Sequence, residues 1–359
     1  FLDPWFGGKR PNSLSVSGYY SRQTGISTDF YGRYYRSPWA YGGGIYGMNY
    51  GYGSSYYDYQ NYNYENSYDP NKFLQMAGIT VGFGKRLNWP DNYFTFQAQL
   101  SYNWYYLKNW EYLYYMNNGT SNAVVLGLSL GRNSTDNPIY TRSGSQFSLD
   151  FNFTPPVSLF RNKDWKALYE SNTQDSKKEM YRWIEYWKLK FKSRTYTPLT
   201  DPEGKWTLVL MTRADIGLLG SYNKYLKSPF ETFYVGGDGM SGSYGYAQET
   251  IALRGYENGA FTPWTKDGYA YTRFCMELHF PFMLQPTTTI YGLAFIEGGN
   301  AWTDVKDVSP FNLKRSAGAG VRIYLPMVGM MGIDWAYGFD TVMGEKGGSH
   351  FHFILGQEF

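Results

Sequence analysis

The chain has 359 residues, 21% of them aromatic, and a formal net charge of +3, which is too small to indicate a nucleic-acid partner. Its single cysteine, Cys275, excludes an intrachain disulfide and a cysteine-rich metal site. No apolar run of about 18 residues encodes a membrane-spanning helix, and the excess of tyrosine and glycine favours strands joined by turns.

Twelve segments alternate between apolar and polar residues with the period of two that predicts a β-strand. In 93–107 the apolar positions from Phe94 to Trp104 lie opposite a face of Thr, Gln, Ser and Asn. That polar face is hard to bury in a dry core and suits a water-filled lumen. The predicted strands are 12–23, 73–87, 93–107, 122–131, 145–153, 186 onward, 206–219, 269–280, 287–300, 315–325, 329–339 and 350–359.

The connections between these strands alternate between short turns and longer loops. Residues 24–71 are dominated by Tyr, Gly, Asn and Ser, and we interpret them as a long outer loop. A charged connection follows 153, with short helices expected at 164–169 and 177–186. The asymmetry is typical of an outer-membrane barrel, with tight turns inside the cell and long loops outside. A soluble sandwich would also alternate, but it rarely needs strands this long.

The predicted fold is therefore all-β: an antiparallel transmembrane β-barrel that occupies 1–359, with about twelve strands present. One strand has a basic inner face, because Trp187, Leu189 and Phe191 alternate with three lysines, Lys188, Lys190 and Lys192.

One arginine stands out in the long connection at 220–267. Arg254 lies between Leu253 and the pair Gly255-Tyr256, shortly after a glycine-rich run at 234–239. Glycine lets the backbone turn sharply, and a buried guanidinium group requires carboxylate partners. Glu277 and Glu297 follow in the chain and are the candidates. An ordinary Arg-Gly turn in a surface loop is the alternative interpretation.

These motifs resemble the outer-membrane insertase family, BamA and its relatives, over nearly the whole chain. The Leu253–Tyr256 motif is similar to the arginine loop of that family, and Phe351 to Phe359 resembles its terminal strand with the final aromatic residue. Three further stretches carry the resemblance: 3–6, 295–302 and 316–326.

The resemblance implies a barrel of sixteen strands with the arginine loop between the eleventh and twelfth. Seven strands are predicted before the loop here and five after it. The chain is thus expected to be the last twelve strands, without the first four and without the upstream periplasmic POTRA domains. The lack of a signal peptide at Phe1 favours this expectation. A complete barrel that closes on twelve strands is the alternative.

By the same resemblance, the loop at 220–267 folds back into the lumen and Arg254 contacts Glu277 and Glu297 on the inner wall. The strand phase points Glu277 inward. Glu297 is in phase with Leu293 and Phe295, so its orientation is less clear, and a bulge at 298–299 is one way to direct its side chain inward.

The implied activity is the assembly and insertion of β-barrel proteins into the bacterial outer membrane, through a lateral seam at the last strand. In that strand the residues expected to face lipid are Phe351, Phe353, Leu355 and Phe359, and those expected to face inward are His352, Ile354, Gly356 and Glu358. Gly356 offers no side chain and would weaken pairing at the seam. The alternative is a two-partner-type secretion pore of the same superfamily.

The expected partners are unfolded β-barrel clients, accessory lipoproteins of an assembly complex and the lipid bilayer, with no nucleic acid. We expect no enzyme, because Asp215, Asp238 and His279 form no recognisable triad. No catalytic residue, cofactor or metal site is predicted.

Overall fold

A computed structural model describes residues 1–4, 6–8, 12–26, 68–110, 116–204, 206–228, 230–240, 248–263, 267–285 and 287–356. Thirteen strands form one antiparallel sheet in chain order. They are β1 (Leu2–Asp3), β2 (Asn12–Ile26), β3 (Tyr68–Arg86), β4 (Phe94–Lys108), β5 (Gly119–Asn133), β6 (Gly144–Phe153), β7 (Trp187–Pro198), β8 (Val209–Gly220), β11 (Ala270–Gln285), β12 (Thr288–Trp302), β13 (Lys314–Leu325), β14 (Gly329–Gly338) and β15 (Ser349–Leu355).

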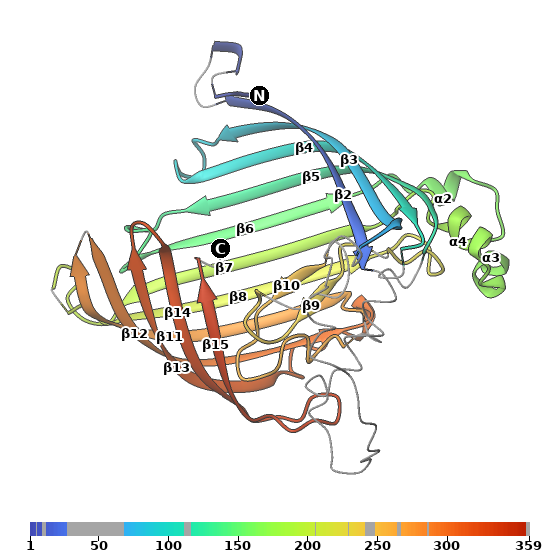
Figure 1. Ribbon diagram of the computed structural model, residues 1–359. Helices are drawn as coiled ribbons and strands as arrows, with labels where there is room; N and C mark the ends of the chain where they lie inside the picture. The colour runs from blue at the N-terminus through green and yellow to red at the C-terminus, as the bar shows by residue number, and fades with distance from the viewer. Residues whose placement is uncertain are drawn as a thin grey trace, which may run out of the picture.

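The sheet curves into the wall of a barrel, with short connections at one end and long ones at the other (Figure 1). Its order runs from β1 to β15, and within the described residues β15 is not hydrogen-bonded to β1 or β2. The wall therefore has two edges, one formed by β1 and β2 and the other by β15.

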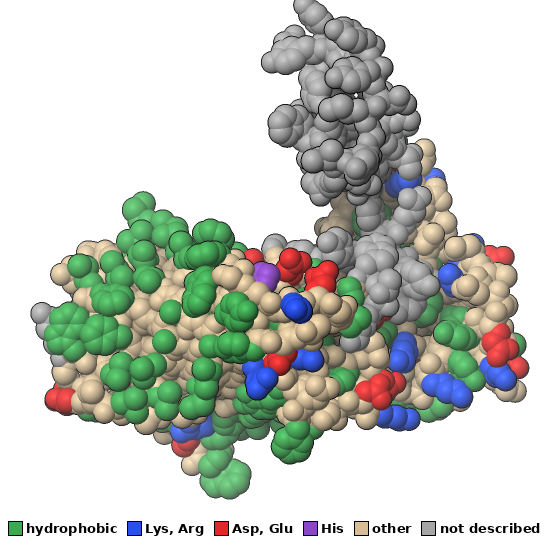
Figure 2. Space-filling model, turned by 90° about the horizontal axis from the view of Figure 1, so that it is seen from below, with side chains coloured by type: hydrophobic (Ala, Val, Ile, Leu, Met, Phe, Trp, Pro, Cys, Tyr) green, Lys and Arg blue, Asp and Glu red, His purple; other side chains and the backbone are tan. Residues whose placement is uncertain are grey.

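The outer face of the wall is apolar. Met276, Ile296, Ile333 and Trp335 are all exposed on neighbouring strands. Figure 2 shows hydrophobic side chains gathered over one part of this face, while most charged side chains lie toward the end with the long connections. An outward apolar band on strands whose inner face is polar is characteristic of a lipid-facing barrel wall. Among the described residues, no helix has the length and apolar character needed to cross a bilayer.

The inner face changes character along the strands. In β4 the inward positions are polar from Thr95 to Asn103, and then Tyr105 and Leu107 are buried and apolar. At that level the connection between β8 and β11 fills the lumen, and its two short strands β9 (Phe233–Val235) and β10 (Glu249–Ile251) pair in parallel. The wet lumen expected from sequence is thus replaced by an apolar core toward the long-connection end. Its fully buried members include Leu74, Leu107, Leu219, Phe233, Val235, Leu253, Phe261 and Tyr271.

Short helices lie in the connection between β6 and β7: α2 (Val157–Phe160), α3 (Trp165–Ser171) and α4 (Gln174–Met180). The Asp164 side chain accepts hydrogen bonds from the backbone N–H groups of Lys166 and Ala167, and Thr173 caps α4. This second cap starts α4 three residues before the predicted 177, and the helix ends at Met180 instead of 186. The described residues also contain two 3-10 turns, η1 (Phe6–Gly8) and η4 (Val305–Asp307).

The predicted fold class and the twelve long strands are confirmed, whereas several details differ. The terminal strand ends at Leu355, because Gly356 has a φ of 85° and turns away. Residues 357–359, with Phe359 among them, lie outside the described residues. Of the loop predicted at 24–71, residues 24–26 belong to β2 and 68–71 to β3, while 27–67 lie outside the described residues. The bulge considered at 298–299 is wrong: the β11–β12 register is continuous there, and its irregularity lies between Pro281 and Met283.

The apolar outer face of the wall predicts that two lysine substitutions differ strongly in their effect on the stability of the protein. Ile296 is 59% exposed near the middle of β12, and Met327 is 98% exposed in the turn between β13 and β14. Ile296→Lys should destabilise the protein in a bilayer by about 2–4 kcal/mol, since it would place a charge among lipid chains. Met327→Lys should change stability little. Urea unfolding in lipid vesicles measures both, and equal stabilities would contradict a lipid-facing band.

Candidate functional site

The segment between β8 and β11 is folded so that one arginine projects toward the wall. Gly237 and Leu253 exchange two backbone hydrogen bonds of 3.1 Å, and Gly237 has a φ of 73°. Just after them, Gly255 has a φ of 87°, and a Cβ there would lie 2.7 Å from Cβ of Ser316 on β13. A residue without a side chain is therefore required where the backbone turns against the wall. We call residues 248–263 the lumenal segment.

Arg254 is the centre of a buried ion-pair cluster. Its side chain reaches three carboxylates from three strands: Nε to Glu297 at 2.8 Å, Nη2 to Glu277 at 2.6 Å, and Nη1 to Asp334 at 2.9 Å. Only 3% of Arg254 is exposed, and its Cζ lies 3.5 Å from the centre of the Phe295 ring. One planar guanidinium group thus ties the lumenal segment to β11, β12 and β14.

Each carboxylate has a second partner. Arg273 donates to Glu297 at 2.7 Å, and Arg322 binds both oxygens of Asp334, at 2.5 and 2.8 Å. The His279 ring nitrogen lies 2.8 Å from the remaining oxygen of Glu277. The cluster therefore sets three arginines against three carboxylates, so that the buried charges of these residues balance.

Two glycines make room for this cluster in the wall. Gly320 is paired with Asp334 across β13 and β14, and a Cβ on Gly320 would lie 1.8 Å from Oδ1 of Asp334. Gly332 is paired with Arg322 in the same way, and its Cβ would lie 2.7 Å from Nη1 of Arg322. Both charged side chains thus lie flat across the facing strand.

The lumenal segment also contacts the terminal strand. The backbone N–H of Gly255 donates to Nε2 of His352 on β15 at 3.0 Å. The hydroxyl of Tyr256 donates to the carbonyl oxygen of Arg315 at 2.7 Å, which fixes the segment to β13. The tip of the segment therefore bridges the wall and the strand at its edge.

A second ionic contact holds the segment to β7, which is separated from β11 by β8 alone. Glu249 lies 3.1 Å from Nζ of Lys188, 3.1 Å from that of Lys190 and 3.6 Å from that of Lys192, all on β7. Burial would raise the pKa of Glu249, but the three ammonium groups outweigh it and lower the pKa to about 2. The basic inner face noted in the sequence thus has its acid on the lumenal segment.

The structure brings Arg254 together with Glu277 and Glu297, the two carboxylates singled out in the sequence, and buries Leu253 and Tyr256 beside them. Glu297 faces inward in phase with Phe295. Sequence reasoning missed Asp334, although it is the one acid among the inward positions of its strand, between Gly332 and Ala336. It also missed Glu249, for which three inward lysines were the available signal.

The remaining candidates are spread over the wall. On β15, Phe351, Phe353 and Leu355 are exposed on the outer face. Asp215 binds Arg213 at 2.5 Å, while His279 binds Glu277, so these two candidate acid–base residues lie in separate contacts.

Comparison with known proteins identifies the family. The Omp85 superfamily domain matches residues 5–359. A comparison with curated protein sequences gives no match. BamA from Haemophilus ducreyi lacking POTRA domains 1–3 is similar in structure, with a TM-score of 0.60 and 14% identity over 98% of this chain. CdiB from Acinetobacter baumannii matches 79% of this chain and 51% of its own at 12% identity, with a TM-score of 0.31.

This chain spans 61% of the length of that BamA chain. The similarity to BamA shows a shared fold, and the domain match extends over the curved sheet, the lumenal segment and the terminal strand. The chain belongs to the Omp85 superfamily, and it is a β-barrel protein of the bacterial outer membrane.

Proposed function

We propose that this protein assembles and inserts β-barrel proteins into the outer membrane, with β15 as one side of a lateral seam. The observation that carries the proposal is the contact between the tip of the lumenal segment and the terminal strand, in which the backbone N–H of Gly255 donates to Nε2 of His352 on β15 at 3.0 Å. Unpaired backbone groups in a membrane are costly. An incoming client strand would satisfy them by adding to the edge.

The proposed activity involves strand pairing and no covalent chemistry. Its partners are unfolded β-barrel clients, accessory lipoproteins of an assembly complex and the bilayer itself. The resemblance to BamA supports POTRA domains and four further strands as parts of the working protein. Residues 24–71 and 220–267 serve in this proposal as an outer loop and a lumenal arginine loop.

A two-partner-type secretion pore is the second candidate, and the polar inner face of β4 favours it. Inward residues from Thr95 to Asn103 would offer hydrogen bonds to an extended polypeptide in transit. A pore of this kind would have to displace the lumenal segment, which the ion pairs of Arg254 and Glu249 oppose.

The two ionic contacts have different physical character. Arg254 is enclosed and shares its charge among three carboxylates, so removing it leaves uncompensated charges in the wall. The side chain of Glu249 is 24% exposed and binds long lysine side chains, so solvent and salt weaken these ion pairs more than those of Arg254. We infer that Arg254 sets the resting position of the segment and that Glu249 steadies its far end.

Arg254→Ala should destabilise the protein by about 3–5 kcal/mol, because Glu277, Glu297 and Asp334 lose their shared cation. Client insertion should slow in parallel. Unfolding in urea and the folding rate of a client barrel in vesicles that contain the complete protein measure the two effects. Arg86→Ala, which alters an exposed arginine at the end of β3, is the matched control. Normal insertion by a stably assembled Arg254→Ala protein would contradict the role of the cluster.

The client assay also separates the two functions. Insertion of several unrelated β-barrel clients by the reconstituted protein is expected for an insertase. Export of one soluble partner without any barrel insertion would replace the proposal with the secretion pore.

The ion pairs of Glu249 predict that the free energy of unfolding depends on pH below about pH 4.3, the ordinary pKa of a glutamate. Its folded pKa of about 2 lies below that value, so its contribution is complete above pH 4.3 and disappears as the pH falls toward 2. Wild type should therefore exceed Glu249→Gln in stability by about 2–3 kcal/mol at neutral pH, and the difference should shrink in acid.

Urea unfolding at a series of pH values measures this difference. Glu257→Gln, which alters an exposed glutamate of the same segment, should show no such trend. A difference between wild type and Glu249→Gln that stayed constant down to pH 2 would rule out the lysine contacts as its cause.

A further inference from the structure

A sharp turn at 237–240, in the connection between β8 and β11, makes a second contact with the terminal strand. Gly237 and Gly239 have φ angles of 73° and 75°, which favour glycine. The backbone N–H of Met240 donates to Oδ1 of Asp238 at 2.8 Å, so the side chain of one turn residue fixes the backbone of another. Because Gly237 also bonds to the lumenal segment, this 237–240 turn holds Met240 in a defined position.

The sulfur of Met240 accepts a backbone hydrogen bond from β15. The N–H of Leu355 lies 3.1 Å from Sδ of Met240. The next N–H in the chain, that of Gly356, donates to the carbonyl oxygen of Met330 on β14 at 2.7 Å. Facing residues in antiparallel strands alternate between bonded and non-bonded pairs. Leu355, opposite Met331, therefore directs its N–H away from β14, to the side on which a further strand would pair.

This contact differs in kind from the one made by Gly255. Gly255 donates to the side chain of His352, which plays no part in the pairing of strands. Met240 instead occupies a main-chain donor of β15 that a neighbouring strand would use. A thioether is a weak acceptor, whereas a backbone carbonyl is a strong one. The N–H of Leu355 thus has an acceptor that a pairing strand could readily replace.

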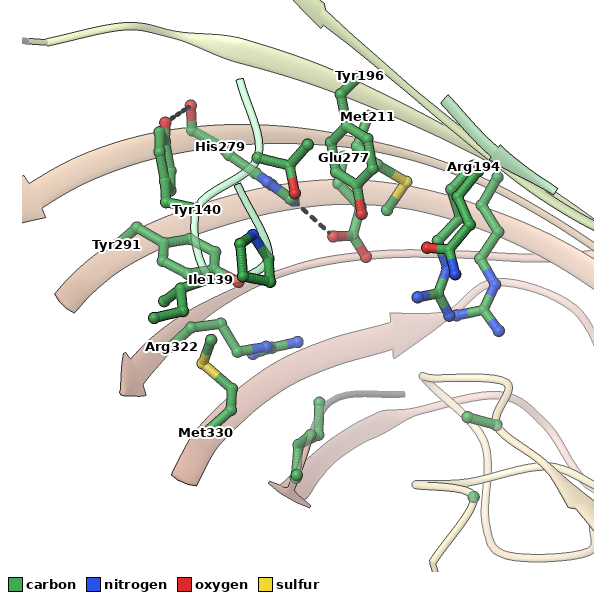
Figure 3. A pocket seen from close by; sticks show the side chains of 18 of the residues that line it. Ile139, Tyr140, Arg194, Tyr196, Met211, Glu277, His279, Tyr291, Arg322 and Met330 are labelled. Atoms are coloured by element: carbon green, nitrogen blue, oxygen red, sulfur yellow. Dashed lines mark hydrogen bonds and ion pairs between the residues drawn. The ribbon is translucent and has the colours of Figure 1, made fainter. Parts of the chain in front are cut away.

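The lumen has room for the Met240 side chain once it is displaced. Met240 and Leu355 both line a cavity of about 340 Å³. Figure 3 shows Ile139, Tyr291 and Met330 on one side of this cavity. A flexible thioether packs well against irregular apolar and aromatic surfaces. The side chain could therefore turn into the cavity while the backbone of the 237–240 turn and the Arg254 cluster stay in place.

We propose that Met240 is a positioning residue of the seam, which holds the N–H of Leu355 until a main-chain carbonyl of a client strand displaces it. The partner is an extended strand of a β-barrel client, recognised at this point by its backbone. Met240 lowers the cost of an unpaired N–H in the membrane while no client is bound. This role rests on the proposed function, because it requires strands to add at β15.

Two substitutions of similar size should have opposite effects. Met240→Leu keeps an apolar side chain but offers no acceptor, so hydrogen exchange at the Leu355 amide and client insertion should each become about fivefold faster. Met240→Gln supplies an amide oxygen, a stronger acceptor, so both rates should fall about fivefold. Both rates are measured on the complete protein in lipid vesicles. Met327→Leu, in the exposed turn between β13 and β14, should change neither rate.

A purely structural role of Met240 would move both variants in the same direction, and that result would overturn the proposal. Unchanged exchange at Leu355 in both variants would refute the contact. Exchange that shifts as expected, with client insertion at the wild-type rate, would refute the role of Met240 and leave the insertase standing. Failure of the wild-type protein to insert any client would refute the insertase and this role together.

Discussion

The position of the lumenal segment depends on one buried guanidinium group. A cation enclosed by protein is tolerated only when anions and hydrogen-bond acceptors surround it. Arg254 meets this requirement with carboxylates from β11, β12 and β14, and each of those carboxylates has another partner. A lysine at this position would offer a point charge in place of a planar fork and would not reach three strands with the same geometry. The cluster thus needs arginine specifically.

The wall and the segment are matched in polarity at two levels. Toward the long-connection end the segment packs its apolar residues against inward apolar residues of the strands, such as Leu107 and Leu219. Lower down the contacts are ionic, and further down still a cavity of about 340 Å³ replaces them. This gradient explains why the inner face of a strand such as β4 is not uniformly polar.

Much of the fold could be predicted from the sequence, because a period of two is a direct consequence of strand geometry. The twelve long strands and the inward orientation of Glu277 follow from it. The limits came from features that periodicity does not encode. The end of β15 depends on a single backbone angle at Gly356. The inward turn at Tyr140 depends on contacts with Thr207 and Tyr291, which are distant in sequence.

The site was predicted less completely than the fold, for a related reason. Arg254 was found because a local motif surrounds it, and its first two partners because they follow on neighbouring strands. Asp334 is 80 residues away from Arg254 in the chain, and no recognisable sequence motif surrounds it. For Glu249 the signal lay in its partners, since the three inward lysines of β7 indicated an acid, and the folded segment brings Glu249 to them.

The glycines at 320 and 332 allow two charged side chains of the Arg254 cluster to lie against the wall. Neither glycine has a side chain, so the carboxylate of Asp334 lies against Gly320 and the guanidinium of Arg322 lies against Gly332. Adding a methyl group at either site would push an ion inward by roughly the width of the group added. Each of the two glycines therefore keeps one ion of the cluster close to the backbone of the wall.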